Sequence, residues 1–164
     1  MVSAHRGAIP ITAYDLAERF VGVSEIPGSQ DNPQLLAMLR LDGSWPEHDE
    51  VPWCSAFTNY VCWLLRLPRS KSLRARSWLT VGRPIELCHA RPGFDVVVLS
   101  RGSNAPGPEV LDAPGHVGFF ARLDSVRAQH VELLGGNQSD SVRVSRYPAK
   151  RVLGVRRLRE EEVA

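Results

Sequence analysis

Residues 52–65, PWCSAFTNYVCWLL, are the stretch of sequence that decides the fold. Pro52 suits the first turn of a helix, where its missing backbone N–H would have no partner in any case. From Cys54 onward apolar residues recur at intervals of three and four, as at Phe57 and Val61. This spacing predicts the longest helix of the chain, with Cys54 at its beginning and on its buried face.

The sequence around this helix predicts three shorter ones, over 12–21, 32–39 and 72–80. Thr12 and Asn32 are residue types that cap helix N-termini, and each directly precedes a segment with helical spacing of apolar residues. We therefore expect the N-terminal half of the chain to be helical.

Beyond Asp95 the pattern changes to short runs of β-branched residues separated by turn residues. The predicted strands are Val96–Leu99, His116–Ala121, Val131–Leu134, Val142–Ser145 and Val152–Val155. Helices followed by strands predict an α+β fold, with N-terminal helices packed on a C-terminal antiparallel β-sheet. At 164 residues we expect one catalytic domain, 1–164, with its core over roughly 12–158.

The composition, 43% hydrophobic and 23% charged, is typical of globular proteins. The longest apolar run is far shorter than a membrane span, so no membrane insertion is expected. A net charge of +2 with dispersed arginines gives no reason to expect a nucleic-acid partner. The first residues lack the apolar region of a secretory signal, which predicts synthesis in the cytoplasm without a signal peptide.

The three cysteines, Cys54, Cys62 and Cys88, form no CxxC pair, so we expect neither a disulfide framework nor a zinc site. Cys54 opens a helix, where unpaired N–H groups and the helix dipole stabilise a thiolate. A buried core cysteine is the commoner interpretation of such a residue, and we assign Cys62 and Cys88 to that class.

A thiol hydrolase needs an imidazole that takes the thiol proton and a third group that orients the ring. His116 begins a predicted strand after Gly115, and Asn137 directly follows another predicted strand. Together with Cys54 these residues could supply the three parts.

Six segments occur in order along the chain: GVSEIPGSQDNP, DEVPWCSAF, ARSW, PGHVGFF, GGNQSDSV and YPAKRVLGVR. Together they resemble a family of phage and prophage cell-wall hydrolases, endolysin-like proteins related to CHAP amidases and NlpC-type papain-like cysteine peptidases. The resemblance covers roughly residues 14–158. It implies a papain-like fold and a peptidoglycan hydrolase that cleaves stem-peptide amide bonds or the N-acetylmuramoyl-L-alanine bond, without an organic cofactor.

Carried onto this chain, the resemblance makes Cys54 the nucleophile, His116 the general base and Asn137 the orienting residue. CHAP relatives place a carboxylate two residues ahead of that asparagine, where this chain has Gly135. Glu132 is therefore the rival third residue.

Strand alternation favours Asn137 over Glu132. Asn137 shares the face of Val131 if the strand is regular, and Glu132 then points the other way. On charge alone Glu132 would hold an imidazolium more strongly, and a bulge at Gly135–Gly136 would reverse the parity.

The residues around the nucleophile suggest how a substrate binds. We expect Trp53 to form a wall of the cleft, and Asp49 and Glu50 to contact a substrate amine. Trp63 lies in mid-helix and is expected in the core, and Trp78 of ARSW is expected to pack beneath the site without a chemical role.

Some CHAP relatives bind calcium through acidic residues ahead of the cysteine, and Asp42 and its neighbours could do so here. Their spacing is not that of an EF-hand loop, so we expect no metal, with calcium as the alternative.

We expect a monomer that acts on bacterial peptidoglycan after holin-type phage release or after secretion as an interbacterial toxin. Two other classes remain open. One is a cysteine acyltransferase or deamidase effector that acts on proteins by the same chemistry. The other is a catalytically silent module that binds the wall.

Overall fold

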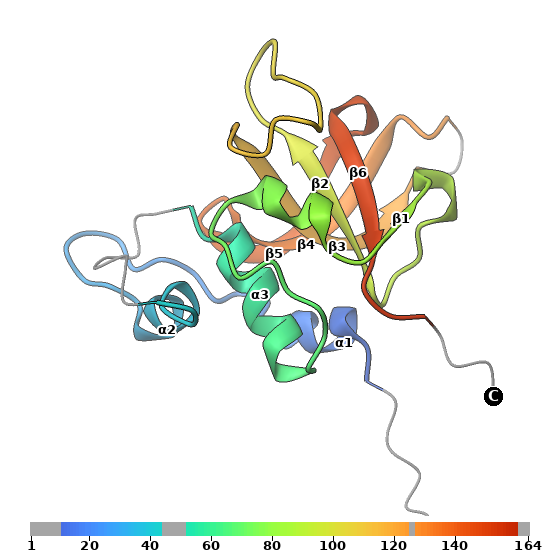
Figure 1. Ribbon diagram of the computed structural model, residues 1–164. Coiled ribbons are helices and arrows are strands. Elements are labelled where there is room, and N and C mark those ends of the chain that lie inside the picture. The colour runs from blue at the N-terminus through green and yellow to red at the C-terminus, as the bar shows by residue number, and fades with distance from the viewer. Residues whose placement is uncertain (1–10, 44–51, 125–126, 161–164) are drawn as a thin grey trace, which may run out of the picture.

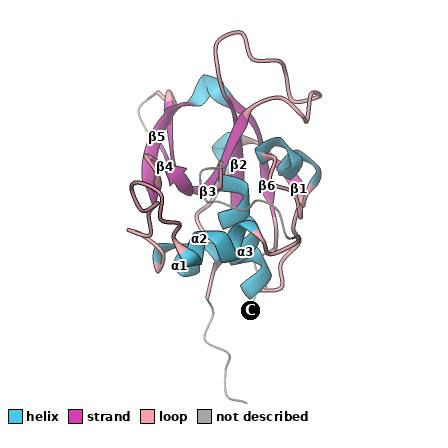
Figure 2. Ribbon diagram, turned by 90° about the vertical axis from the view of Figure 1, so that its left-hand side faces the viewer, coloured by secondary structure: helices cyan, strands magenta, loops and turns pink. Residues whose placement is uncertain are grey.

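The computed structural model describes residues 11–43, 52–124 and 127–160. The α-helices are α1 (Ala13–Glu18), α2 (Pro33–Leu39) and α3 (Cys54–Leu64), and the 3-10 helices are η1 (Ala75–Thr80), η2 (Leu87–His89) and η3 (Ala149–Arg151). Figures 1 and 2 show the three α-helices gathered together beside the strands. The predicted α+β class, with N-terminal helices on a C-terminal antiparallel sheet, is confirmed.

The sheet has six antiparallel strands in the order β1-β6-β2-β3-β4-β5. Their bounds are β1 (Arg83–Ile85), β2 (Asp95–Ser100), β3 (Gly115–Leu123), β4 (His130–Gln138), β5 (Ser141–Pro148) and β6 (Val152–Arg157). All five predicted strands are present. β1 was not predicted, because three residues with Pro84 at the centre show no strand pattern, and a proline is tolerated only at a sheet edge.

The predicted caps hold the first two helices. The Asp15 backbone N–H donates to Thr12 Oγ1 at 3.1 Å, and the Thr12 N–H donates to the Asp15 carboxylate at 2.9 Å, which forms a capping box. Asn32 accepts from the Gln34 N–H at 2.9 Å and donates to the Ser24 carbonyl at 2.8 Å. Asn32 thus both caps α2 and ties it to the preceding segment.

The core has a cluster on each face of the sheet. Val96 and Val98 of β2 pack in the cluster that also contains α3, while Val97 and Leu99 pack in a second cluster. Because β2 is buried on both faces, its sequence is a continuous apolar run without alternation. The neighbouring strand β3 carries His116, which pairs in register with Leu99.

The outer side of α3 differs from the prediction for Trp63. Val61 is fully buried, but Trp63 is 48% exposed. Trp63 lies two residues beyond Val61, which is about 200° further round the helix, and its side chain faces away from the sheet. The Trp63 ring packs instead on Tyr60, with 5.8 Å between centroids.

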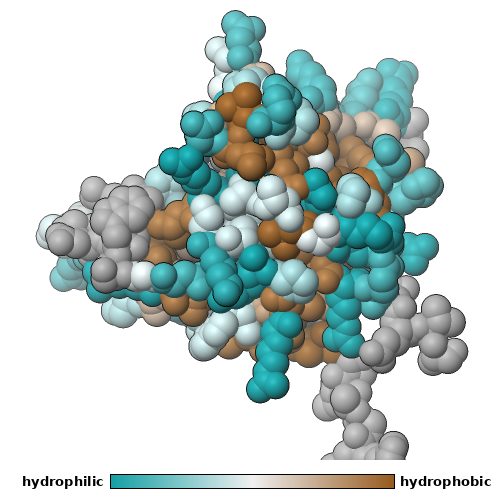
Figure 3. Space-filling view, viewed as in Figure 1, coloured by the Kyte–Doolittle hydropathy of each residue, from teal (hydrophilic) through white to brown (hydrophobic). Residues whose placement is uncertain are grey.

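The visible surface is mixed in character. On the face shown in Figure 3, apolar side chains form several separate areas with hydrophilic side chains between them. Within the described residues, no helix combines the length and the apolar composition that a membrane span requires.

Gly136 of β4 lets the first turn of α3 lie directly on the sheet. A Cβ atom at this position would be 2.5 Å from Trp53 Cζ3 and 2.7 Å from Phe57 Cβ. Both of these side chains are fully buried, so neither can move aside easily.

We therefore expect Gly136→Ala to lower the free energy of unfolding by about 1–3 kcal/mol, the usual cost of overpacking a core. Urea unfolding followed by circular dichroism measures this. Gly43→Ala is the matched control, since an added Cβ at Gly43 meets no atom within 4 Å. Equal stability of the two variants would contradict the close packing.

Candidate active site

Cys54 is the first residue of α3 and is 4% exposed. Trp53 precedes it and makes no side-chain cap hydrogen bond to the first turn of the helix. Burial raises the pKa of the Cys54 thiol, and hydrogen bonds from the backbone N–H groups of Val117 and Ser55 offset part of this rise. The sulfur therefore lies against the backbone of β3 at Val117, the residue that follows His116.

A network of hydrogen bonds fixes the first turn of α3 from behind. Trp78 Nε1 donates to Ser55 Oγ at 2.9 Å, and Ser55 Oγ donates to the Ser72 carbonyl at 2.6 Å. Thr58 Oγ1 donates to the Cys54 carbonyl at 3.0 Å. The indole of the ARSW segment is fully buried beneath the helix start, as its sequence position led us to expect.

His116 lies in β3 and is 6% exposed. Burial lowers its pKa to about 4; the hydrogen bond with Gln138 opposes this shift, and the positive charges of Arg101 and Arg151 add to it. At neutral pH the imidazole is therefore uncharged and able to accept a proton.

Gln138 is the side chain that contacts the imidazole of His116. Its Oε1 lies 3.0 Å from His116 Nε2, and its Nε2 donates to the Leu133 carbonyl at 3.1 Å and to the Arg143 carbonyl. The two carbonyl acceptors fix the orientation of the amide, so its oxygen faces the imidazole. A carbonyl oxygen only accepts, which places the proton of neutral His116 on Nε2 and leaves Nδ1 as the basic nitrogen.

The sequence predicted Asn137 or Glu132 as the residue that orients the ring, whereas in the structure it is Gln138 that contacts the imidazole. The register between β4 and β5 shifts between Gly135 and Gln138, and Asn137 has a left-handed φ of 56°. This bulge moves the inward position from Asn137 to the next residue. Glu132 is instead paired with Arg122, at 2.7 Å.

Tyr147 completes the surroundings of the imidazole. Its hydroxyl donates to Gln138 Oε1 at 2.8 Å, and its ring centroid lies 5.4 Å from that of His116. The guanidinium of Arg151 lies 5.4 Å from the centre of the Tyr147 ring. Sequence reasoning quoted both residues within the YPAKRVLGVR segment but gave them no role, because only the fold brings this segment to His116.

The expected cleft wall is corrected too. Trp53 is fully buried, and its Nε1 donates to Glu25 Oε1 at 2.7 Å, so the indole is part of the core. Asp49 and Glu50, expected to contact a substrate amine, lie outside the described residues. Asp42, a possible calcium ligand, pairs with Arg69 at 2.9 Å.

The other two thiols differ from each other. Cys62 is fully buried, and burial raises the pKa of its thiol. Cys88 is exposed, so its assignment to the core is corrected. Among residues 11–43, 52–124 and 127–160, no three histidine, cysteine, aspartate or glutamate side chains are grouped so that they could hold a metal ion.

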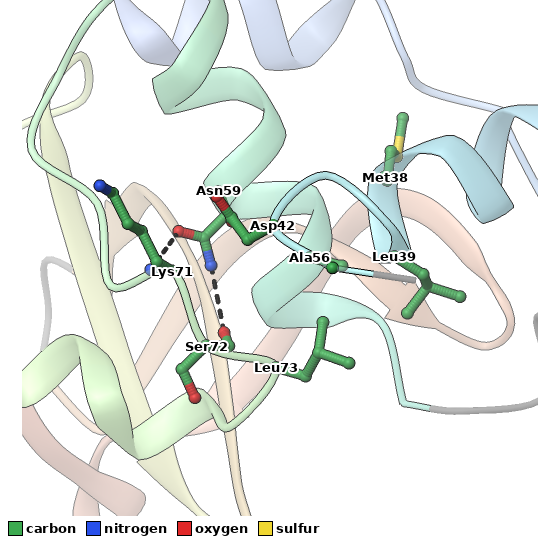
Figure 4. Close-up of a pocket in the computed structure, with 9 residues that line it drawn as sticks. Met38, Leu39, Asp42, Ala56, Asn59, Lys71, Ser72 and Leu73 are labelled. Carbon is green, nitrogen blue, oxygen red and sulfur yellow. Dashed lines mark hydrogen bonds between the residues drawn. The ribbon is translucent and has the colours of Figure 1, made fainter. Parts of the chain in front are cut away.

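A separate pocket lies between α2, α3 and residues 71–73 (Figure 4). Asn59 accepts from the Lys71 N–H at 3.0 Å and donates to the Ser72 carbonyl at 3.1 Å. Because Ser72 also accepts from Ser55, Asn59 supports the segment behind Cys54. This pocket is not lined by Cys54, His116 or Gln138.

Taken together, a cysteine at a helix start, a histidine on β3 and an amide in contact with the imidazole are the three kinds of group that a thiol hydrolase needs. The chain matches no protein-family model, and comparison with curated proteins finds no match. Among solved structures it is similar to NlpC1 from Trichomonas vaginalis, with a TM-score of 0.50 and 16% sequence identity. The similarity covers 89% of this chain and 42% of that chain. The fold is therefore NlpC-like, and the chain spans less than half the length of that neighbour.

Burial of neutral His116 predicts a specific loss of stability in acid. Unfolded histidine has a pKa of about 6.5, whereas the pKa in the folded state is about 4. The unfolded chain thus binds the proton first, so the stabilisation is complete above about pH 6.5 and is lost as the pH falls to about 4, a loss of about 3 kcal/mol.

We expect wild type to lose about this much more stability than His116→Gln between pH 7.5 and pH 4, measured by urea unfolding. His89→Gln, a change at an exposed histidine, is the control and should keep the wild-type dependence. Parallel curves for wild type and His116→Gln would refute the buried neutral state.

Proposed function

We propose that this chain is a cysteine-dependent peptidoglycan hydrolase, an endolysin-like enzyme that cleaves amide bonds of the bacterial cell wall. It would act as a stem-peptide endopeptidase or as an N-acetylmuramoyl-L-alanine amidase. The observation that carries the proposal is the His116–Gln138 hydrogen bond beside Cys54 at the start of α3, in an NlpC-like fold.

The first step is a proton transfer. Gln138 holds the Nε2–H of His116, so the lone pair of Nδ1 is available to take the proton of the Cys54 thiol. Burial shifts the pKa values of the two groups in opposite directions and keeps both neutral in the free protein. The ion pair then forms during the reaction.

The resulting thiolate attacks the carbonyl carbon of the scissile amide. The backbone N–H groups at the start of α3, which the Trp53 side chain does not cap, lie beside Cys54 and can stabilise the negative charge on the carbonyl oxygen. As the C–N bond breaks, the imidazolium returns its proton to the leaving amine and a thioester remains. Water, deprotonated by His116, then hydrolyses the thioester, releases the acid and regenerates the thiol.

The substrate class follows from the six sequence segments and not from the fold alone. PWCSAF contains Cys54, GHVGF contains His116, and GGNQS contains Gln138, so three of the six segments carry the residues of the site. The proposed steps use no cofactor and one copy of the chain. The site of action in this proposal is the bacterial wall, reached by phage lysis or by delivery of a toxin.

Cys54→Ala should abolish the release of fragments from purified peptidoglycan, because the covalent route needs the sulfur. Cys62→Ala is the control and should retain activity, since that thiol is buried elsewhere in the core. Mass spectrometry of wild-type digests identifies the cleaved bond from its new amine.

The same assay separates the competing functions. Retention on the wall without fragments would indicate a binding module, and neither retention nor fragments would favour an effector that acts on proteins. Release of fragments by Cys54→Ala at the wild-type rate would refute the mechanism.

His116→Ala should lower kcat/KM by a factor of about 10²–10⁴, the usual contribution of a general base. Gln138→Ala should lower kcat by a factor of up to about 10², because the ring loses the acceptor that orients it.

Asn137→Gly is the matched control for Gln138→Ala, since glycine keeps the left-handed backbone at that position. Asn137→Gly and Glu132→Gln should both stay within about twofold of wild type. A larger loss for either of them than for Gln138→Ala, with folding verified by circular dichroism, would return the orienting role to that residue.

A further inference from the structure

Arg101 and Arg151 come from distant segments of the chain and lie near the same end of β2. Arg101 is exposed and directly follows Ser100 at the end of β2, which pairs in register with Gly115, the neighbour of His116. Arg151 of η3 donates from Nε and from one terminal nitrogen to the Ser100 carbonyl, at 3.0 and 2.8 Å. Arg151 thus lies beside the residue that directly precedes Arg101.

Arg151 is also linked to the catalytic imidazole through an aromatic ring. Its guanidinium lies over Tyr147, and the Tyr147 ring contacts that of His116. The positive charge of Arg101 acts on Cys54, His116 and Tyr147, and that of Arg151 acts on His116 and Tyr147. Together with the contacts of Arg151 to Ser100 and Tyr147, these charge effects place positive charge close to the imidazole.

Neither arginine pairs with a carboxylate in the part of the chain that the structure describes. Other arginines there do have carboxylate partners, in the pairs Arg69–Asp42, Arg83–Glu160, Arg122–Glu132, Arg146–Asp124 and Arg157–Asp95. Two uncompensated guanidinium groups beside a closed site create a positive potential that favours an anion. Because burial still raises the pKa of Cys54, their charge does not hold a permanent thiolate.

We propose that Arg101 and Arg151 form a carboxylate-binding subsite beside Cys54, and that the preferred substrate carries a free carboxylate on a residue flanking the scissile amide. This inference deepens the proposed function, on which its choice of substrate rests. Guanidinium groups recognise carboxylates through paired N–H donors, and the hydrogen bonds of Arg151 within the described residues leave its second terminal nitrogen for such a contact.

The first test needs no peptide substrate. Iodoacetate and iodoacetamide are similar in size and lose iodide to the same thiol, but only iodoacetate carries a carboxylate. The ratio of their alkylation rates at one cysteine therefore cancels its accessibility and nucleophilicity. We expect the iodoacetate-to-iodoacetamide ratio at Cys54 to be about tenfold higher than at exposed Cys88 of the same molecule, and to fall as salt is added.

Three variants locate the charge responsible. Arg101→Gln and Arg151→Gln should each lower the ratio at Cys54 toward that at Cys88, and Arg151→Lys should restore part of it. Arg122→Gln is the matched control, because Arg122 lies six residues from His116, roughly 20 Å along β3, and should leave the ratio unchanged. Equal ratios at Cys54 and Cys88 in wild type would overturn the subsite, and failure of both reagents to label Cys54 would overturn the accessible nucleophile along with it.

The second test uses pairs of stem peptides that differ only in a free or amidated carboxyl group next to the scissile amide. One series has this group on the acyl side and the other on the amine side, so the series that responds locates the subsite. Wild type should show a KM at least about tenfold lower for the free acid, and Arg101→Gln should abolish this preference.

The outcomes separate the two proposals. If Arg101→Gln lowers kcat equally for the free-acid and the amidated peptide of a pair, Arg101 stabilises the transition state, and carboxylate recognition is overturned. A high iodoacetate-to-iodoacetamide ratio at Cys54, without cleavage of any peptide, would refute the proposed hydrolase and still support the anion subsite.

Discussion

The indole of Trp53 lies so close to Gly136 that no side chain fits between α3 and β4. The rest of the site depends on this contact. Glu25 accepts the indole N–H at 2.7 Å, so the ring is fixed at its polar edge as well as on its face. With Trp53 held in the core, the next residue begins α3, and its sulfur lies against the backbone of Val117. The position of Cys54 is thus a consequence of core packing, in which the residue ahead of it has no contact with solvent.

The second determinant of the site is the bulge at the end of β4. Gly135 leaves the space that the Gln138 amide fills, since a Cβ there would be 3.3 Å from Gln138 Oε1. The left-handed residue Asn137 makes the chain turn so that Gln138 faces His116. The two glycines therefore matter for different reasons: Gly136 leaves room for α3, and Gly135 leaves room for the side-chain amide of Gln138.

Most of the fold could be predicted from the sequence because the relevant signals are local. Caps such as Thr12 act within one turn, and the apolar spacing of α3 repeats along the helix itself. The identity of the third residue could not be predicted in the same way. Strand parity is reliable only while the strand is regular, and one inserted residue was enough to exchange Asn137 for Gln138.

The two tryptophans show the same limit. Trp53 was assigned to the surface and Trp63 to the core, and the structure reverses both. Proximity in sequence to the nucleophile says nothing about the direction of a side chain, which the helix period and the close contact at Gly136 decide. The positions of Tyr147 and Arg151 near His116 could not be predicted for another reason. They depend on the order of the strands in the sheet, which no local sequence pattern encodes.

An amide in the third position suits the electrostatics of this site. A buried carboxylate in place of Gln138 would favour the protonated imidazolium and raise the pKa of His116, whereas an uncharged oxygen orients the ring without that large electrostatic effect. The arginines act in the same direction, since their charges also favour the neutral imidazole. The free site therefore holds a neutral base within a positive surrounding. A negative charge that enters, on a substrate carboxylate or on the developing oxyanion, is stabilised by the two arginines, whose own charges no carboxylate among the described residues neutralises.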